Sequence, residues 1–111
     1  MKFVCMSSEI KPGEAKRVEV DGRAPLAVFN LDGKFFVTDD TCTHGDASLC
    51  DGEIDGDVVE CPYHQGAFEI ATGKPAGAPC TIPLRTYATQ VTEGQVFARL
   101  DGEDGNADRQ A

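Results

Sequence analysis

Asp-Gly and Glu-Gly pairs recur along the chain and divide it into short segments, which limits the folds that it can adopt. They include Asp21-Gly22, Asp32-Gly33, Asp51-Gly52, Asp55-Gly56, Glu93-Gly94 and Asp101-Gly102. Glycine accepts the positive φ of tight hairpin turns, and Asp can hydrogen-bond its own backbone there. No window of helical length carries an apolar stripe with a period of 3.6 residues. The chain is therefore predicted to be all-β.

Runs rich in β-branched and aromatic residues fill the intervals between these turns and are predicted strands. They cover residues 16–20, 25–31, 35–38, 58–61, 67–70, 81–92 and 95–100. Several alternate apolar and polar residues, as in Leu26/Val28 and Val96/Ala98, which directs one strand face to a core. A hairpin is predicted at 29–36 around Asp32-Gly33. Such strands indicate an antiparallel β-sandwich or a small barrel.

The length of 111 residues suits a single domain, predicted over residues 1–101. The tail 102–111 is polar and lacks an apolar anchor, so it is expected to be flexible. No apolar run has the length of a membrane span or of a secretory signal. We therefore expect a soluble cytoplasmic protein that does not bind membranes.

Charge is distributed unevenly along the chain. The formal net charge of −9 argues against a nucleic-acid partner, because phosphate binding needs a basic face. Between Phe35 and Gly73 there is no Lys or Arg, and the stretch is expected to form an acidic surface that steers the protein onto basic partners. Its acidic residues are Asp39, Asp40, Asp46, Asp51, Glu53, Asp55, Asp57, Glu60 and Glu69.

Two short motifs carry both histidines of the chain. They are Cys42-Thr43-His44 and Cys61-Pro62-Tyr63-His64, separated by sixteen residues. Two thiolates and two imidazoles can hold one structural zinc, or a [2Fe–2S] cluster with both thiolates on one iron and both imidazoles on the other. Zinc sites more often pair Cys with Cys and His with His, whereas each motif here mixes the two. The mixed pattern favours a cluster held between two loops.

The other three cysteines, Cys5, Cys50 and Cys80, have no patterned neighbour. The odd count of five argues against a closed disulfide framework. We expect them to be small apolar fillers or unreactive surface thiols.

The two motifs, with Cys61-Pro-Tyr-His-Gln-Gly-Ala-Phe68, Ala71-Thr-Gly-Lys74 and Ala78-Pro-Cys-Thr-Ile-Pro83, resemble the Rieske-type ferredoxins of bacterial aromatic-ring-hydroxylating dioxygenase systems. The resemblance spans roughly residues 3–101. It implies a β-sheet base with a cluster-binding subdomain at its tip, at about 40–80. It also implies one [2Fe–2S] cluster on Cys42, His44, Cys61 and His64, and a third loop near Pro79 and Pro83. The resemblance further implies that the chain carries electrons from an NADH-dependent flavin reductase to a terminal Rieske oxygenase. We expect this chain to be a monomer.

Departures from high-potential Rieske proteins are informative within this resemblance. Those proteins carry a disulfide where this chain has Ala47 and Tyr63, and sulfur-bonding hydroxyls where it has Gly66 and Phe68. Fewer donors to sulfur stabilise the reduced state less. The reduction potential is therefore predicted toward the low end of the Rieske range, on the order of −150 mV.

The sequence lacks the motifs of the other components of such a system. A terminal oxygenase would need two further histidines and a carboxylate for a mononuclear iron, and a reductase would need a Gly-x-Gly-x-x-Gly fingerprint. Neither is present in the sequence. No catalytic residue is predicted, so the chain is not expected to be an enzyme. The alternatives that stay open are a Rieske-like small subunit, as in assimilatory nitrite reductase, and a structural zinc module.

Overall fold

The computed structural model describes residues 1–43, 47–62, 66–77 and 82–100, and the regular secondary structure of these residues is almost entirely β. The strands are β1 (Lys2–Met6), β2 (Glu14–Val18), β3 (Leu26–Leu31), β4 (Lys34–Asp39), β5 (Glu53–Asp55), β6 (Val58–Glu60), β7 (Ala67–Glu69), β8 (Pro75–Gly77), β9 (Thr86–Tyr87), β10 (Thr89–Thr92) and β11 (Gln95–Ala98). Two single-turn 3-10 helices, η1 (Ser7–Glu9) and η2 (Leu49–Asp51), complete the described elements. The all-β prediction is confirmed. Within the described part of the chain, no helix is long and apolar enough to cross a membrane.

Two antiparallel sheets form the base of the molecule. One has the order β1-β11-β10 and the other β2-β3-β4-β9. Apolar side chains from both sheets pack together in what we call the base core, which consists of Val4, Cys5, Ile10, Leu26, Val28, Val37, Tyr87, Val96 and Ala98. Burial of these side chains joins the sheets into the expected sandwich.

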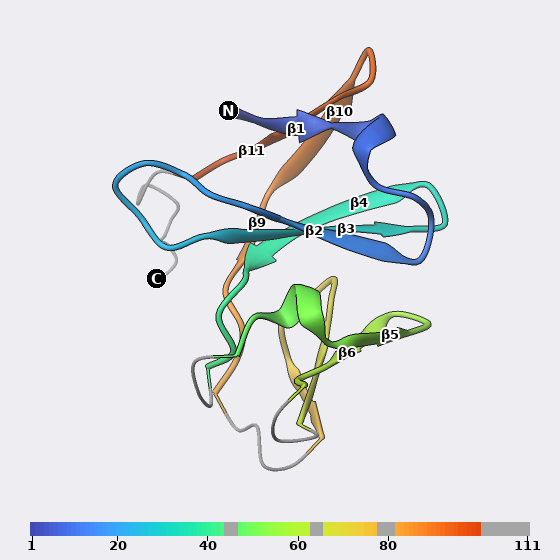
Figure 1. Ribbon diagram of the computed structural model, residues 1–111, viewed down its shortest axis with the longest axis vertical. Helices are drawn as coiled ribbons and strands as arrows, with labels where there is room; N and C mark the ends of the chain where they lie inside the picture. The colour runs from blue at the N-terminus through green and yellow to red at the C-terminus, as the bar shows by residue number, and fades with distance from the viewer. Residues whose placement is uncertain (44–46, 63–65, 78–81, 101–111) are drawn as a thin grey trace.

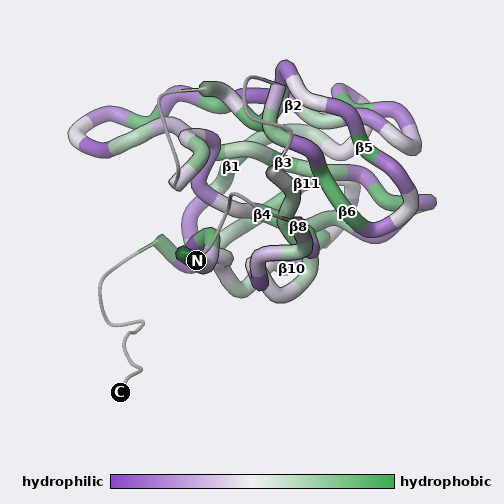
Figure 2. The backbone as a smooth tube through the Cα atoms, turned by 90° about the horizontal axis from the view of Figure 1, so that it is seen from below, coloured by the Kyte–Doolittle hydropathy of each residue, from purple (hydrophilic) through white to green (hydrophobic). Residues whose placement is uncertain are grey.

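A third antiparallel sheet, β5-β6-β7-β8, lies beside the base, and we call it the lobe sheet (Figure 1). Its buried side chains meet those of the base in the lobe core, which consists of Ala27, Phe29, Cys42, Ala47, Leu49, Val59, Cys61, Phe68, Ile70 and Leu84. Figure 2 shows the apolar colours mainly in the central strands and the hydrophilic colours mainly in the outer turns. The structure thus has a base and a smaller lobe, as the resemblance implied.

Strand β3 is buried on both faces, which the sequence pattern did not predict. Leu26 and Val28 point into the base core, whereas Ala27 and Phe29 point into the lobe core. All four are fully buried. The side chains of this strand alternate between two apolar cores, whereas in most strands they alternate between a core and solvent.

The hairpin predicted at 29–36 is confirmed. β3 and β4 pair antiparallel with Phe29 opposite Phe36. The turn residues Asp32 and Gly33 have φ values of 57° and 94°, the left-handed conformation that a two-residue hairpin turn requires.

Two expectations about local structure were wrong, and three strands were not predicted. Asp51-Gly52 is not a positive-φ turn: Gly52 ends η2 at φ −85°, and a Cβ there would lie 1.8 Å from the Glu60 carbonyl oxygen. Glycine is therefore needed for close backbone approach. The run 81–92 is not one strand, because β9 ends at Tyr87 and β10 begins at Thr89 in a different sheet. The chain segments Lys2–Met6, Glu53–Asp55 and Pro75–Gly77 form strands that were not predicted.

Candidate metal centre

Both predicted thiol ligands begin loops of the same construction. Cys42 follows β4, and its amide donates a 2.9 Å hydrogen bond to the Ala47 carbonyl. Cys61 follows β6, and its amide donates a 2.7 Å hydrogen bond to the Gly66 carbonyl. Each loop is therefore closed by a bond between residues i and i+5. His44 and His64 fall within these loops but outside the described residues.

The two thiols reach one buried region from different elements. Cys42 and Cys61 are each 2% exposed and both belong to the lobe core. Ala47 and Phe68 pack in the same core. The structure brings together the cysteines of the two motifs, nineteen positions apart in sequence.

The first loop is braced on both sides of its stem by backbone and side-chain bonds. Thr41 and Ser48 form an isolated antiparallel bridge, and the Leu49 amide donates to the Asp40 carbonyl at 2.8 Å. The Asp40 carboxylate accepts hydrogen bonds from the Ser48 hydroxyl, at 2.9 Å, and from the Cys50 amide, at 3.2 Å. These bonds fix where the Cys42 loop starts and ends.

A third segment contacts the first loop. The Thr43 hydroxyl donates to the Ile82 carbonyl at 2.8 Å, and the Leu84 amide donates to the Gly73 carbonyl at 2.7 Å. Ile82 is 60% exposed and Pro83 is exposed, whereas Pro79 and Cys80 lie outside the described residues. The contact supports the expectation of a third segment beside the predicted ligand loops.

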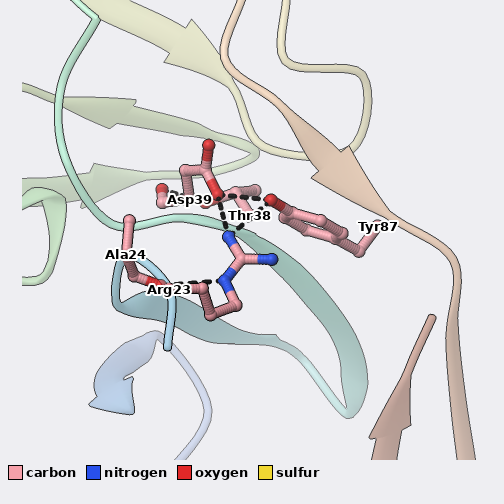
Figure 3. A network of polar contacts seen from close by, with 5 residues as sticks. All are labelled: Arg23, Ala24, Thr38, Asp39 and Tyr87. Atoms are coloured by element: carbon pink, nitrogen blue, oxygen red, sulfur yellow. Dashed lines mark hydrogen bonds and ion pairs between the residues drawn. The ribbon is translucent and has the colours of Figure 1, made fainter. Parts of the chain in front are cut away.

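A polar network joins the end of β4 to β9 where the chain passes between base and lobe (Figure 3). One Arg23 nitrogen donates to the Asp39 carboxylate at 2.8 Å and to the Tyr87 hydroxyl at 2.7 Å, and that hydroxyl donates to Asp39. The Arg23 and Arg85 guanidinium groups lie 5.0 Å and 5.2 Å from the Tyr87 ring centre. Burial and the hydrogen bond to Asp39 raise the pKa of Tyr87, so the hydroxyl stays a donor. Sequence reasoning missed this network, because its members are far apart in the chain.

The described acidic residues between Phe35 and Gly73 divide into two groups. Those of η2, the lobe sheet and its turns are exposed, namely Asp51, Glu53, Asp55, Asp57, Glu60 and Glu69. The surface prediction is wrong for Asp39, which is half-buried in the network, and for Asp40, which is 1% exposed. Asp46 lies outside the described residues.

The two described cysteines outside the motifs agree with the expectation for them. Cys5 is buried in the base core, and burial raises its pKa from 9.0 to about 11. Cys50 is half-buried, and burial together with a hydrogen bond to Asp40 raises its pKa as well. Both are therefore protonated thiols near neutral pH, whereas metal ligands are thiolates.

The two cysteine sulfurs at the starts of the loops, and the apolar side chains around them, suit a cluster bound by thiolates. Two sulfurs in one apolar core form a low-polarity setting for such a group. Gly66, Phe68 and Ala47, all buried, have no side-chain hydroxyl or thiol to offer there.

Comparison with known proteins identifies the family. The family model of the Rieske [2Fe-2S] domain matches residues 1–88. The chain belongs to the Rieske [2Fe-2S] domain family. It therefore carries one Rieske-type [2Fe–2S] cluster, a group that exchanges single electrons when bound.

Similar Rieske proteins cover most of this chain. Ferredoxin CarAc of Metapseudomonas resinovorans is 52% identical over 94 residues, which are 85% of this chain and 88% of that one. The biphenyl 2,3-dioxygenase ferredoxin component of Rhodococcus jostii (strain RHA1) is 40% identical over 99 residues, 89% of this chain and 92% of that one. A solved complex of reduced oxygenase and oxidized ferredoxin in carbazole 1,9a-dioxygenase contains a chain that superposes with a TM-score of 0.83 at 48% identity, covering 89% of this chain and 95% of that one.

Proposed function

We propose that this chain is a soluble Rieske ferredoxin of a bacterial aromatic-ring-hydroxylating dioxygenase system. It accepts one electron at a time from an NADH-dependent flavin reductase and delivers it to a terminal Rieske oxygenase. It acts as a cytoplasmic monomer and is a carrier, not an enzyme. Its ligands are Cys42, His44, Cys61 and His64, within a cluster-binding subdomain at about 40–80.

The observation that carries this proposal is the pair of equivalent loops. Each has a buried cysteine at its start and a backbone bond between residues i and i+5 at its base. Each also has a histidine within the loop sequence. A structural zinc site does not require two loops that each contain one cysteine and one histidine. Rieske coordination does require them, because each loop supplies one ligand to each iron.

The similar proteins favour a free carrier over a small subunit of a nitrite reductase. The Rhodococcus relative is named as a ferredoxin component of a dioxygenase, and the carbazole structure pairs a ferredoxin with an oxygenase. By analogy, the partner of this chain is an oxygenase of the same kind.

The lobe sheet offers this partner an acidic face. Glu53 lies directly opposite Glu60, and Val58 lies between Asp55 and Glu69, so the four carboxylates share one face of the sheet. Like charges directly opposite one another in a sheet are destabilising. We propose that the face attracts a basic surface on a partner and speeds encounter at low ionic strength.

The test is reconstitution combined with spectroscopy. The purified, anaerobically reconstituted protein should contain two irons and two sulfides and give a rhombic electron paramagnetic resonance signal after dithionite. It should also couple NADH oxidation by a candidate reductase to substrate oxidation by a candidate oxygenase. A colourless protein with one zinc would refute the cluster, and an intact signal without coupling would refute the dioxygenase role.

Single substitutions test the ligand set. His44→Ala and His64→Ala should each abolish the Rieske signal, and the matched thiol variants Cys42→Ser and Cys61→Ser should lose the cluster. Cys5→Ser and Cys50→Ser serve as controls and should keep full iron content. Retention of the native signal in any of the first four variants would remove that residue from the ligand set.

A further inference from the structure

Asp40 is a buried carboxylate beside the first predicted ligand loop. Its side chain is 1% exposed, and it lies two residues before Cys42. Burying a charge costs free energy unless it is paired and hydrogen-bonded. The burial of an aspartate at this position therefore indicates that its carboxylate has a role beyond packing.

The hydrogen bonds of Asp40 do not require its charge. Oδ1 accepts from the Ser48 hydroxyl at 2.9 Å and from the Cys50 amide at 3.2 Å. The Cys50 thiol also hydrogen-bonds to this side chain. The amide oxygen of an asparagine can accept bonds of the same kind. The loop could thus be held without a negative charge.

Arg17 is the one cation within 4 Å of the Asp40 carboxylate among the described residues, and it compensates the charge only partly. Oδ2 lies 3.8 Å from the Arg17 Nε, which is too long for a hydrogen bond. The same Nε is 2.8 Å from Glu19, and the Arg17 side chain is 49% exposed. Arg17 is therefore shared with a second carboxylate and solvated, so it offsets Asp40 incompletely.

A negative charge at this position acts electrostatically on any group that the Cys42 loop binds. The Asp40 carbonyl accepts from Leu49, and the carboxylate binds Ser48 and Cys50, so Asp40 is fixed to both ends of the loop. Reduction adds one negative charge to a cluster held by that loop. A buried carboxylate close by opposes this addition more strongly than an exposed one, because water screens it less.

We infer that Asp40 is a positioning residue that fixes the Cys42 loop and uses its buried charge to hold the reduction potential of this protein down. The inference rests on the proposed ligand set, since it requires the cluster to bind at Cys42. It adds a residue outside that set, and it gives a role to a carboxylate that costs stability.

The test is the midpoint potential of the cluster-loaded protein, measured by protein-film voltammetry, with iron content and resonance g-values as checks. Asp40→Asn keeps an acceptor for Ser48 and Cys50 and removes the charge. We expect it to shift the one-electron equilibrium about tenfold toward the reduced form, which is about 59 mV upward. The g-values and iron content should stay as in the wild type.

Matched variants separate charge from loop structure. Ser48→Ala removes one hydrogen bond and keeps the charge, so it should not raise the potential. Asp55→Asn removes an exposed charge of the lobe sheet and should shift the potential much less than Asp40→Asn. Arg17→Gln removes the partial counter-charge and should lower the potential, whereas Lys34→Gln, at the far end of β4 from Asp39, should have little effect.

The outcomes distinguish this inference from the proposed function. If the wild type shows no Rieske signal, the proposed function itself fails. If the signal is normal but the potential of Asp40→Asn is unchanged, or rises no more than that of Asp55→Asn, the charge has no tuning role. If Asp40→Asn does not fold, Arg17→Gln decides: an unchanged or higher potential in that variant overturns the inference.

Discussion

Gly73 is the position where one added methyl group tests the packing of the lobe most directly. It has a φ of +78°, and a Cβ built on it would lie 2.0 Å from the Leu84 carbonyl oxygen. Leu84, whose amide donates to the Gly73 carbonyl, is 2% exposed in the lobe core. The contact ties together the two ends of the segment 74–83, which includes the proposed third loop. Gly73→Ala should therefore loosen both the lobe core and that loop.

The cost of Gly73→Ala can be separated into two contributions by comparison with Gly22. Gly22 has almost the same φ, +80°, but nothing lies within 4 Å of its Cβ position. Gly22→Ala should therefore cost only the left-handed backbone strain, about 1 kcal/mol. Gly73→Ala should cost that strain plus displacement of the Leu84 carbonyl and loss of the hydrogen bond from the Leu84 amide to the Gly73 carbonyl, together about 3–4 kcal/mol.

The assay is thermal loss of the visible cluster absorbance, at one scan rate and under anaerobic conditions. A difference of 2–3 kcal/mol between the variants corresponds to an apparent melting point about 10 °C lower for Gly73→Ala than for Gly22→Ala. Cluster loss at a fixed temperature should also be faster in Gly73→Ala. Equal shifts in the two variants would refute the reasoning, because the close approach to Leu84 would then cost nothing.

Three further predictions concern charge, pH and potential. Glu60→Gln removes the repulsion between the Glu60 and Glu53 carboxylates, so it should stabilise the protein by a few tenths of a kcal/mol. It should also slow electron transfer to the oxygenase at low salt. Equal rates for the variant and the wild type in stopped-flow measurements would exclude steering. Because the folded-state pKa of Cys5 is raised from 9.0 to about 11, its contribution to stability is complete below pH 9 and is lost as pH rises to 11, by about 2–3 kcal/mol. Cys5→Ala should lessen that decline in melting temperature, and an identical profile would contradict the assignment. The wild-type potential should be on the order of −150 mV, and Phe68→Tyr, which adds a hydroxyl donor, should raise it in voltammetry; a fall would count against the donor argument.

Local signals predicted the parts of the fold that depend on local conformation. Asp32-Gly33 located a hairpin because few other residue pairs accept two successive positive φ values. The same dipeptide at Asp51-Gly52 was misleading, since its glycine is needed for the approach of the Glu60 backbone, which is a long-range contact. Pro75–Gly77 was missed because proline and glycine disfavour strands, although proline is tolerated at an edge such as β8.

At the candidate site, the features that the sequence did not predict depend on contacts between residues far apart in the chain. Cys42 and Cys61 were found from their spacing to histidine, and the fold brings both into the lobe core. Asp40 was taken for a surface residue because it stands in an acidic stretch, and its burial depends on Ser48 and Cys50 folding back onto it. Arg23 gave no signal at all, since its partner Tyr87 is sixty-four residues away.

The sharing of β3 between two apolar interiors limits how this protein can be dissected. A fragment containing only the two ligand loops and the lobe sheet would lack Ala27 and Phe29, and its interior would be open to water on one side. Grafting the redox unit onto another scaffold would therefore require a host strand that supplies an equivalent apolar wall. For the same reason, melting of the lobe and melting of the base should occur as one cooperative event.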